Sequence, residues 1–169
     1  MSDSGFSVRR ARTSDVPHIQ KLVEPFVSRR ILLGKDSVVF YGAIQEFRIA
    51  EDPKGNPIGC GALHVMWEDL AEVRTLAVRP GWLHRGVGHA LLDRLEDDAR
   101  VLGLSRLFCL TFEVEFFEKH DFAPMSDEIL EPAVYAELLR SPDEGVAEFL
   151  DLARVKPNTL GNTRMIKHL

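Results

Sequence analysis

The chain has 169 residues, of which 45% are hydrophobic and 28% are charged, and its formal net charge is −5. This length predicts a single domain over residues 1–169, and the negative charge without a basic run argues against nucleic acid as a partner. No stretch approaches about 18 apolar residues and no hydrophobic signal segment opens the sequence, so we expect a cytoplasmic protein without a membrane partner.

Cysteine and histidine usage argues against disulfides and metals. Cys60 and Cys109 both lie in apolar segments that resemble strands, where buried free thiols are expected rather than a disulfide. None of the six histidines has the spacing or the neighbours of a metal site, so no metal is expected.

The first half of the chain predicts a meander of antiparallel strands, with helices inserted after the first strand. Residues 6–11 alternate weakly, as in a strand, and Pro17 fits the first turn of the helix that follows. The remaining expected elements are a short helix over residues 36–43, strands over 47–51 and 58–66, and a hairpin turn over 52–56.

Residues 72–92 are typical of a strand, a loop and a helix, and the rest of the chain is organised around them. The strand covers residues 72–78, Pro80 and Gly81 end it, and apolar residues then recur at helical spacing. The first amides of a helix have no intrahelical partner, and the helix dipole adds partial positive charge there. Gly86 and Gly88 carry no Cβ, so a phosphate could approach this loop closely. The alternative is an ordinary β-loop-α turn without a ligand.

Two common phosphate motifs are excluded. The G-x-x-x-x-G-K-[ST] string is absent, and the dinucleotide fingerprint fails because Leu91 replaces its third small residue and Arg106 stands where its acidic residue belongs. The strand LAV followed by Arg-Pro, a short loop, x-x-G-x-G and A-L-L instead resembles motif A of the GCN5-related N-acetyltransferase superfamily. The resemblance implies that acetyl-CoA is the cosubstrate and that the loop amides hold its pyrophosphate. The residues it places at the coenzyme here are His84, Arg85, Gly86, Val87, Gly88 and His89.

The second half begins at Gly103, which is well placed to end the central helix. Residues 107–110 form a continuous apolar run, as in a strand buried on both faces, and together with residues 72–78 they predict a right-handed β-α-β unit. Later expected elements are short helices from 113 and from 132, an acidic segment over 143–152, turns over 155–162 and a closing strand over 163–169. The expected fold is the α/β (α+β) acetyltransferase fold in the order β-α-α-β-β-β-β-α-β-α-β, with a mixed sheet, an antiparallel N-terminal meander and helices on both faces.

Longer strings sharpen the resemblance. The segments GCGALH (59–64), RILL (30–33), WEDLAEVR (67–74), GLSRLFCLT (103–111) and FEKHDFAP (117–124) resemble the acetyltransferase domain of N-acetylglutamate synthases. The tail LARVKPNTLGNTRM (152–165) resembles the short, kinase-less amino-acid N-acetyltransferases of actinobacteria. The resemblance implies transfer of acetyl to the α-amino group of L-glutamate or L-glutamine, the first step of arginine biosynthesis. The long synthases carry a kinase-like domain for which this chain has no room, so arginine feedback through such a domain is left open.

Two positions depart from the pattern of the wider superfamily. Leu83 takes the place of a usual glutamine or arginine, but the cradle works mainly through main-chain amides, and Arg85 is available to supply charge. Phe117, expected beside the coenzyme, stands where many relatives carry a tyrosine that protonates the departing thiolate, and the synthase branch resembles this chain in lacking it. A thiol with a pKa of about 8.5 is a tolerable leaving group without a dedicated acid.

Direct transfer without an acyl-enzyme needs a base, because an ammonium group cannot attack a thioester. Glu72, at the start of the central strand, is the candidate base, acting through water; Glu113 competes for the role, and a solvated strand-end glutamate is the plainer alternative. The backbone of Leu76, Ala77 and Val78 is expected to contact pantetheine and the thioester carbonyl, with an N–H aimed at the developing oxyanion.

An amino-acid acceptor brings at least one carboxylate, which an arginine can hold in a bidentate way. Arg74 shares a strand face with Glu72 by period two and is the first candidate, followed by Arg30 or Arg29 after the first helix. A structural salt bridge for Arg74 and a solvated turn for the other two arginines are the alternatives.

Cys109 and Thr111, in and just after the second parallel strand, are also placed at the acceptor. As a nucleophile, Cys109 competes with a plainer role as a small core residue, and His84 and His89 compete with being solvated residues at a helix start. Two other functions stay open, namely acetylation of another amine or a protein N-terminus, and an acyl-CoA-binding regulatory module without turnover. The terminal strand and the irregular tail are candidate elements of a homodimer.

Overall fold

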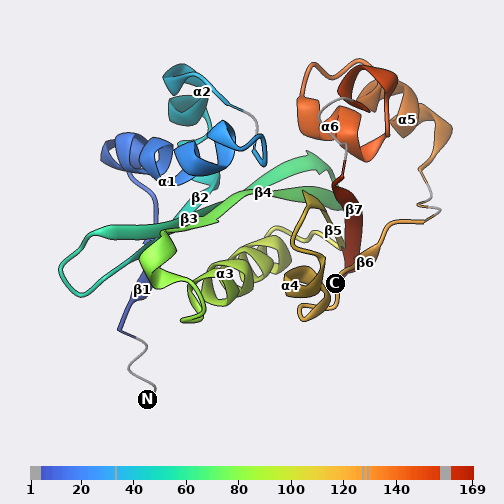
Figure 1. The fold of residues 1–169 in the computed structure, drawn as a ribbon. Helices are drawn as coiled ribbons and strands as arrows, with labels where there is room; N and C mark the ends of the chain where they lie inside the picture. Colours follow the sequence, from blue (N-terminus) through green and yellow to red (C-terminus); the bar gives the residue numbers. More distant parts are fainter. Residues whose placement is uncertain (1–4, 33, 127, 129, 157–160) are drawn as a thin grey trace. The chain divides into compact units, whose positions relative to one another are not determined.

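The computed structural model describes residues 5–32, 34–126, 128, 130–156 and 161–169 (Figure 1). Its strands are β1 (Ser7–Arg10), β2 (Phe47–Glu51), β3 (Pro57–Trp67), β4 (Leu70–Val78), β5 (Arg106–Thr111), β6 (Ala123–Pro124) and β7 (Thr163–His168). Its α-helices are α1 (Val16–Ser28), α2 (Ser37–Gly42), α3 (Val87–Val101), α4 (Val114–Glu118), α5 (Pro132–Leu138) and α6 (Glu144–Phe149). Single 3-10 turns are η1 (Thr13–Asp15), η2 (Ile44–Glu46), η3 (Pro80–Trp82) and η4 (Ala153–Val155). Among these residues, no helix is both long enough and apolar enough to cross a membrane.

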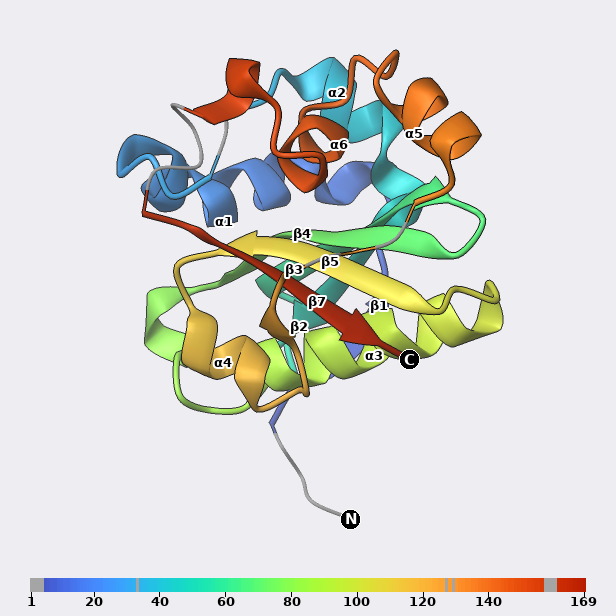
Figure 2. The ribbon, with the colours of Figure 1, turned by 90° about the vertical axis from the view of Figure 1, so that its right-hand side faces the viewer.

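The strands form one mixed sheet in the order β1-β2-β3-β4-β5-β7-β6. β1 pairs antiparallel with β2, and β2 with β3, which confirms the expected N-terminal meander. β4 and β5 pair in parallel from Leu70↔Arg106 to Glu72↔Phe108, as expected for the central unit. β7, predicted as the closing strand, lies antiparallel alongside β5 and also pairs with β6 (Figure 2).

The expected order of elements is wrong in two details. Three strands, not four, lie between α2 and α3, a stretch that the structure describes throughout. The segment contains a turn at residues 52–56 and the two-residue turn before β4, and β3 alone takes up 11 residues, so no length remains for a fourth strand. β6 was not expected, because a strand of two residues gives no periodic signal in a sequence.

The chain divides into two compact units, the first made of Met1–His64 and Val73–Leu102, and the second of Val65–Glu72 and Gly103–Leu169. In the first unit, helices cover both faces of the strands, as expected (Figure 1). Ile49 of β2 packs with α1 and α2 on one face, and its neighbour Ala50 packs with α3 on the other. Adjacent residues point to opposite faces because side chains alternate along a strand. The expectation of one domain over residues 1–169 stays a prediction.

Close packing of α3 on β3 explains why a glycine lies inside that strand. A Cβ at Gly59 would come within 3.0 Å of side-chain atoms of Val87 and Leu91. Real Cβ atoms rarely tolerate such a distance, so the missing side chain lets helix and strand approach one another.

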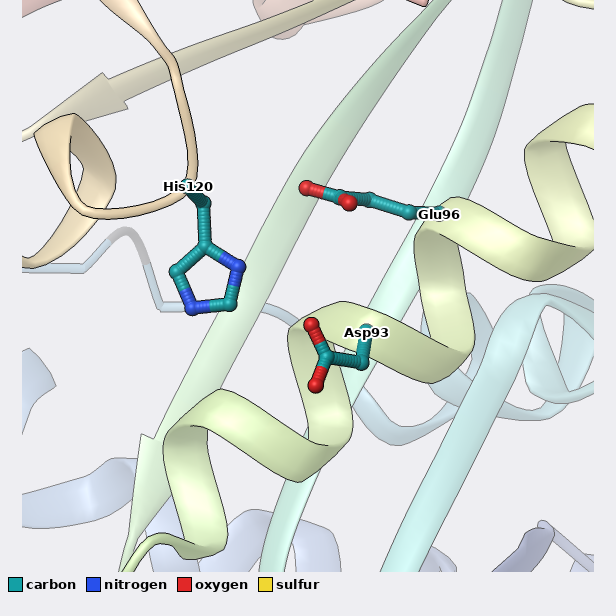
Figure 3. Close-up of side chains that lie close together, drawn as sticks. All are labelled: Asp93, Glu96 and His120. Carbon is teal, nitrogen blue, oxygen red and sulfur yellow. The ribbon is translucent and has the colours of Figure 1, made fainter.

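The charged side chains on α3 differ in their surroundings. Asp98 accepts two hydrogen bonds from Arg48 of β2, at 2.5 and 2.7 Å, so the pair ties the helix to the strand. Asp93 and Glu96 project from neighbouring turns of the helix (Figure 3). Glu96 is buried and lies 3.9 Å from Arg100, whereas Asp93 is exposed.

The second unit has its own apolar cluster, in which residues from β4, β5, β7 and α6 meet. The rings of Phe108 and Phe149 pack edge to face, with centroids 5.4 Å apart. Arg106 of β5 donates to Asp69 at 3.0 Å and to Glu128 at 3.2 Å. The buried members of the cluster are Leu70, Phe108, Phe149 and Ile166.

Candidate active site

The interior of β4 departs from regular strand geometry at Thr75, whose φ is 58°. This left-handed value is rare for a β-branched residue and indicates backbone strain. The Thr75 carbonyl accepts a hydrogen bond from the buried Cys60 thiol at 3.3 Å, which helps to hold the unusual backbone. Glu72 and Arg74 both lie before Thr75. The prediction that they share a strand face rests on alternation along the strand, and the irregular residue does not interrupt that alternation between them. No feature of the sequence marks Thr75 as unusual.

The loop after β4 begins with the η3 turn. The Trp82 amide donates to the Arg79 carbonyl at 2.8 Å, and the Trp82 ring lies beneath the Arg85 guanidinium, 3.8 Å from its centre. Such a cation–π contact restrains a side chain that is otherwise exposed. His84 is also exposed and has a positive φ of 61°. The charge expected from Arg85 is therefore present at this loop, but its guanidinium is stacked on Trp82.

Gly86 turns the chain from this loop into α3, with a φ of 85° that favours glycine. The first hydrogen bond of the helix runs from the Ala90 amide to the Gly86 carbonyl at 3.0 Å. The amides of Gly86, Val87 and Gly88 therefore come before the first helical donor. The first turn contains no acidic residue, so the partial positive charge of this helix end is not neutralised there. This helix start is the backbone arrangement on which the predicted anion site depends, and anion binding there stays a prediction.

The side chains around these amides differ in exposure. Val87 is buried and belongs to the apolar cluster beneath α3, whereas His89 is exposed. Leu76 and Val78 pack with the same cluster, and Ala77 lies in the cluster on the opposite face. The chain from Leu76 to Val78 is therefore fixed from both faces of the sheet.

The two candidate bases have contrasting environments. Glu72 is only 4% exposed and pairs with Phe108 in the β4–β5 ladder of the second unit. Glu113 is exposed, and its amide donates to the Thr111 hydroxyl oxygen at 2.8 Å. Thr111 is itself buried, so its hydroxyl organises the start of α4.

The two cysteines are free and buried, as predicted. Burial raises the pKa of the Cys109 thiol well above its usual value, and the Glu72 carboxylate raises the pKa further. Burial likewise raises the pKa of Cys60 to about 12. Because the thiolate is the nucleophilic form, both thiols are poor nucleophiles at neutral pH.

Phe117 of α4 is buried in an aromatic group. Its ring packs against Phe116 with centroids 5.1 Å apart and against Phe122 at 5.2 Å, in both cases nearly perpendicular. Each pair has the edge-to-face geometry that aromatic rings favour. No hydroxyl is available at this position to protonate a leaving group.

The candidate arginines for the acceptor come from different elements. Arg74 is half-buried in β4, whereas Arg29 and Arg30 are exposed in the turn after α1. The Arg29 guanidinium lies 5.6 Å from the centre of the Phe26 ring, and Arg30 has a positive φ of 58°. The positive φ at Arg30 identifies a tight turn, which is the plainer of the two predicted roles for this segment.

A cavity of about 400 Å³ in the second unit was not anticipated from the sequence. Arg164 of β7 donates to the carbonyls of Glu148 and Phe149 at the end of α6, which holds the guanidinium in place. Lys156 pairs with Asp151 at the same cavity. The signal that could have indicated this cavity is the polar N-T-R string at the start of the predicted last strand. The described lining residues are Leu110, Pro124, Met125, Asp151, Lys156, Asn162, Thr163 and Arg164.

Comparison with known proteins shows the family and the fold of this chain. A model of the acetyltransferase (GNAT) family matches residues 18–122. The amino-acid acetyltransferase of Mycobacterium tuberculosis is 54% identical over 161 residues, which are 94% of this chain and 92% of that protein. The amino-acid acetyltransferase of Neisseria meningitidis serogroup A is 38% identical over 126 residues, and the match spans 73% of this chain but only 29% of that protein.

Two solved structures show the same fold. The crystal structure of Rv2747 from Mycobacterium tuberculosis, in complex with CoA and NLQ, has a TM-score of 0.92 at 53% identity and covers 96% of this chain and 99% of that one. N-acetylglutamate synthase from Neisseria gonorrhoeae, complexed with coenzyme A and N-acetyl-glutamate, has a TM-score of 0.77 at 30% identity and covers 97% of this chain but 35% of that one. The expected fold is confirmed, and the chain belongs to the acetyltransferase (GNAT) family.

Proposed function

We propose that this protein transfers an acetyl group from acetyl-CoA to the α-amino group of L-glutamate or L-glutamine. The observation that carries the proposal is the glycine loop, whose amides at residues 86–88 open α3 without an acidic residue in the first turn. The acceptor is inferred from the relatives: the Mycobacterium tuberculosis protein is named an amino-acid acetyltransferase, and the Neisseria gonorrhoeae synthase was solved with N-acetyl-glutamate.

The coenzyme is proposed to bind through main-chain groups of the first unit. The amides of Gly86, Val87 and Gly88 would hold the diphosphate, with His84, Arg85 and His89 around it. The backbone of Leu76, Ala77 and Val78 would contact pantetheine, with one N–H donating to the thioester oxygen as negative charge develops there. Phe117 would add an apolar contact, which its buried aromatic surroundings support.

Chemically, the acceptor's ammonium group first gives a proton to a base, and the neutral amine then attacks the thioester carbonyl carbon. The C–N bond forms, the C–S bond breaks, and the thiolate of CoA leaves with its electron pair. With a thiol pKa of about 8.5, this thiolate needs no dedicated acid, which agrees with a phenylalanine at position 117. We assign the base to Glu72, acting through water, because a buried carboxylate is shielded from competing solvent, whereas Glu113 is exposed.

Two sets of residues are candidates for the acceptor's carboxylates. The first is Arg74, followed by Arg30 or Arg29, as the sequence predicts. The second is the cavity of the second unit, where Arg164, Thr163 and Asn162 offer donors at one wall. Cys109 and Thr111 flank Leu110 in β5, and because side chains alternate along a strand, both face away from the side of Leu110 that lines this cavity. Their predicted contact with the acceptor therefore does not follow from this cavity.

The direct test measures thiol release from acetyl-CoA with a panel of glutamate, glutamine, arginine and short peptides. We expect release with glutamate or glutamine and an N-acetylated product of matching mass. Release only with peptides or other amines would identify a different acceptor. Tight CoA binding without release for any acceptor would favour a regulatory module instead. A homodimer and a cytoplasmic location stay predictions.

A further inference from the structure

A second, smaller hollow lies in the first unit, where α1 meets the ends of β3 and β4. Its volume is about 90 Å³, which is room for several water molecules or one small ligand. It is distinct from the loop amides at residues 86–88 and from the cavity of the second unit, and no step of the proposed reaction uses it. Its lining residues are His18, Lys21, Leu22, Pro25, Pro57, Arg79 and Pro80.

The charged side chains among the lining residues are basic, although the Asp15 carboxylate interacts with His18 from outside the lining. Lys21 and Arg79 are both exposed and carry positive charge, and no carboxylate is among the lining residues. Within the part of the chain that the structure describes, neither Lys21 nor Arg79 takes part in an ion pair. In a protein of net charge −5, two cations around one hollow indicate a site for an anion.

The floor of the hollow selects the kind of anion. Leu22 is buried, and Pro25, Pro57 and Pro80 offer rigid rings without an N–H donor. An inorganic oxyanion would lose water there without gaining the hydrogen bonds it needs on all sides. An organic carboxylate with a short apolar body fits better, because its body covers the prolines while its charged end meets the cations.

One residue that lines the hollow, Arg79, also begins the loop that leads to Gly86. The Arg79 amide donates to the Ile58 carbonyl at 2.7 Å, and the Arg79 carbonyl accepts from the Trp82 amide at 2.8 Å. Trp82 in turn supports Arg85 by the contact at 3.8 Å, directly before Gly86. A ligand that holds Arg79 would therefore restrain the residue from which the loop begins.

We propose that this hollow is an effector site for a small aliphatic carboxylate, which pairs with Lys21 and Arg79 and rests on the three prolines. By fixing Arg79, the bound carboxylate preorganises the loop, so acetyl-CoA binds more tightly when the site is filled. The coupling is reciprocal, because each ligand must change the other's affinity by the same factor.

The test titrates 3-methylbutanoate into the full-length protein and follows backbone amide signals by NMR. We expect saturable shifts centred on Lys21 and Arg79, and none with 3-methylbutanamide, which has the same shape without the charge. The Lys21→Gln/Arg79→Gln variant should bind at least about tenfold more weakly. The Lys54→Gln/Arg94→Gln variant makes the same change of charge at exposed sites elsewhere in this unit and should bind normally.

The coupling is measured by calorimetry of acetyl-CoA with and without saturating 3-methylbutanoate. We expect a severalfold lower dissociation constant with the carboxylate present, and no such change in the Lys21→Gln/Arg79→Gln variant. Equal binding of the amide, displacement of the carboxylate by acetyl-CoA, or an unchanged affinity for acetyl-CoA would each overturn the proposal. Inorganic phosphate serves as a third probe. If phosphate binds more tightly than the carboxylate, the apolar lining does not select the ligand, and the proposal of a carboxylate site is overturned.

Discussion

The two compact units carry their candidate functional groups in different ways. In the first unit the main groups proposed for the coenzyme are backbone amides, beside positive φ angles at His84 and Gly86. In the second they are side chains, such as the buried carboxylate of Glu72 and the guanidinium of Arg164, which two backbone carbonyls hold. A backbone site depends on conformation within one short stretch, whereas a side-chain site depends on contacts between distant stretches. We therefore expect the first to be sensitive to glycine replacement and the second to changes of functional group.

The largest effect is expected from Glu72→Gln, which keeps the shape of the side chain and removes the proposed base. Turnover should fall by about 10²- to 10⁴-fold, the range that a positioned base contributes, while the affinity for acetyl-CoA should stay near normal. Steady-state kinetics with glutamate or glutamine and calorimetry with acetyl-CoA measure the two quantities. Glu113→Gln is the matched control at an exposed glutamate, and a greater loss there would transfer the role to Glu113.

Next in size is Gly86→Ala, which tests the backbone site. The residue has a φ of 85°, and a Cβ there would meet open space, so the change adds conformational strain without a clash. A left-handed conformation costs about 1–2 kcal/mol for a non-glycine residue, and the affinity for acetyl-CoA should fall roughly tenfold. Gly81→Ala is the control, because Gly81 lies in the same loop, also faces open space and has no positive φ. Equal losses in the two variants would contradict a specific role for the Gly86 conformation.

A smaller effect concerns the stability of the first unit. Asp15 accepts hydrogen bonds from Arg9 at 2.8 and 2.9 Å and from the Arg12 amide at 2.6 Å. The Arg9 guanidinium, followed by the Arg12 amide, lowers the pKa of Asp15 below its ordinary value of 3.8. Its stabilisation is therefore complete above pH 3.8 and is lost as the pH falls through the lowered value.

Asp15→Asn should accordingly lower the free energy of unfolding by about 1–3 kcal/mol at pH 7. The difference between the two proteins should shrink toward zero in strong acid, because the native carboxyl is then protonated. Urea unfolding at a series of pH values measures it. A difference that does not change with pH would show that the charge of Asp15 is not what stabilises this region.

The smallest effect is expected from Cys109→Ala. Because burial and the nearby Glu72 carboxylate raise the pKa of this thiol, it should not form an acyl-enzyme. Acetyl transfer should stay within a few-fold of normal, and mass spectrometry after mixing with acetyl-CoA alone should detect no acetylated protein. A loss of turnover comparable to that of Glu72→Gln would show that Cys109 takes part in acetyl transfer.

The contrast between the units also explains what the sequence could predict. The glycine loop and α3 were predicted because glycines and a 3.6-residue period lie within one continuous stretch. Buried free thiols followed from the apolar neighbours of Cys60 and Cys109. These features depend on local sequence, which periodicity and turn residues describe well.

Other features depend on partners that a sequence pattern does not reveal. The positive φ of Thr75 occurs in a segment that is otherwise typical of a strand. The closing strand was predicted, but its place between β5 and β6 depends on long-range pairing. The cavity around Arg164 combines residues from β5, β6 and β7 with the segment after α6. The roles of individual residues in binding and catalysis stay predictions for the variants above to test.

The brevity of the outermost strands has a consequence for how copies of this chain can associate. β1 has four residues and β6 only two, one of which is a proline that lacks an N–H donor. Fibrils grow when a long, open strand recruits the same segment from another molecule. β1 and β6 are each too short to act as such a template, but β6 pairs with only Met165 and Ile166 of β7. The terminal strand β7 therefore keeps open edge positions among the described residues and stays a candidate element of a homodimer.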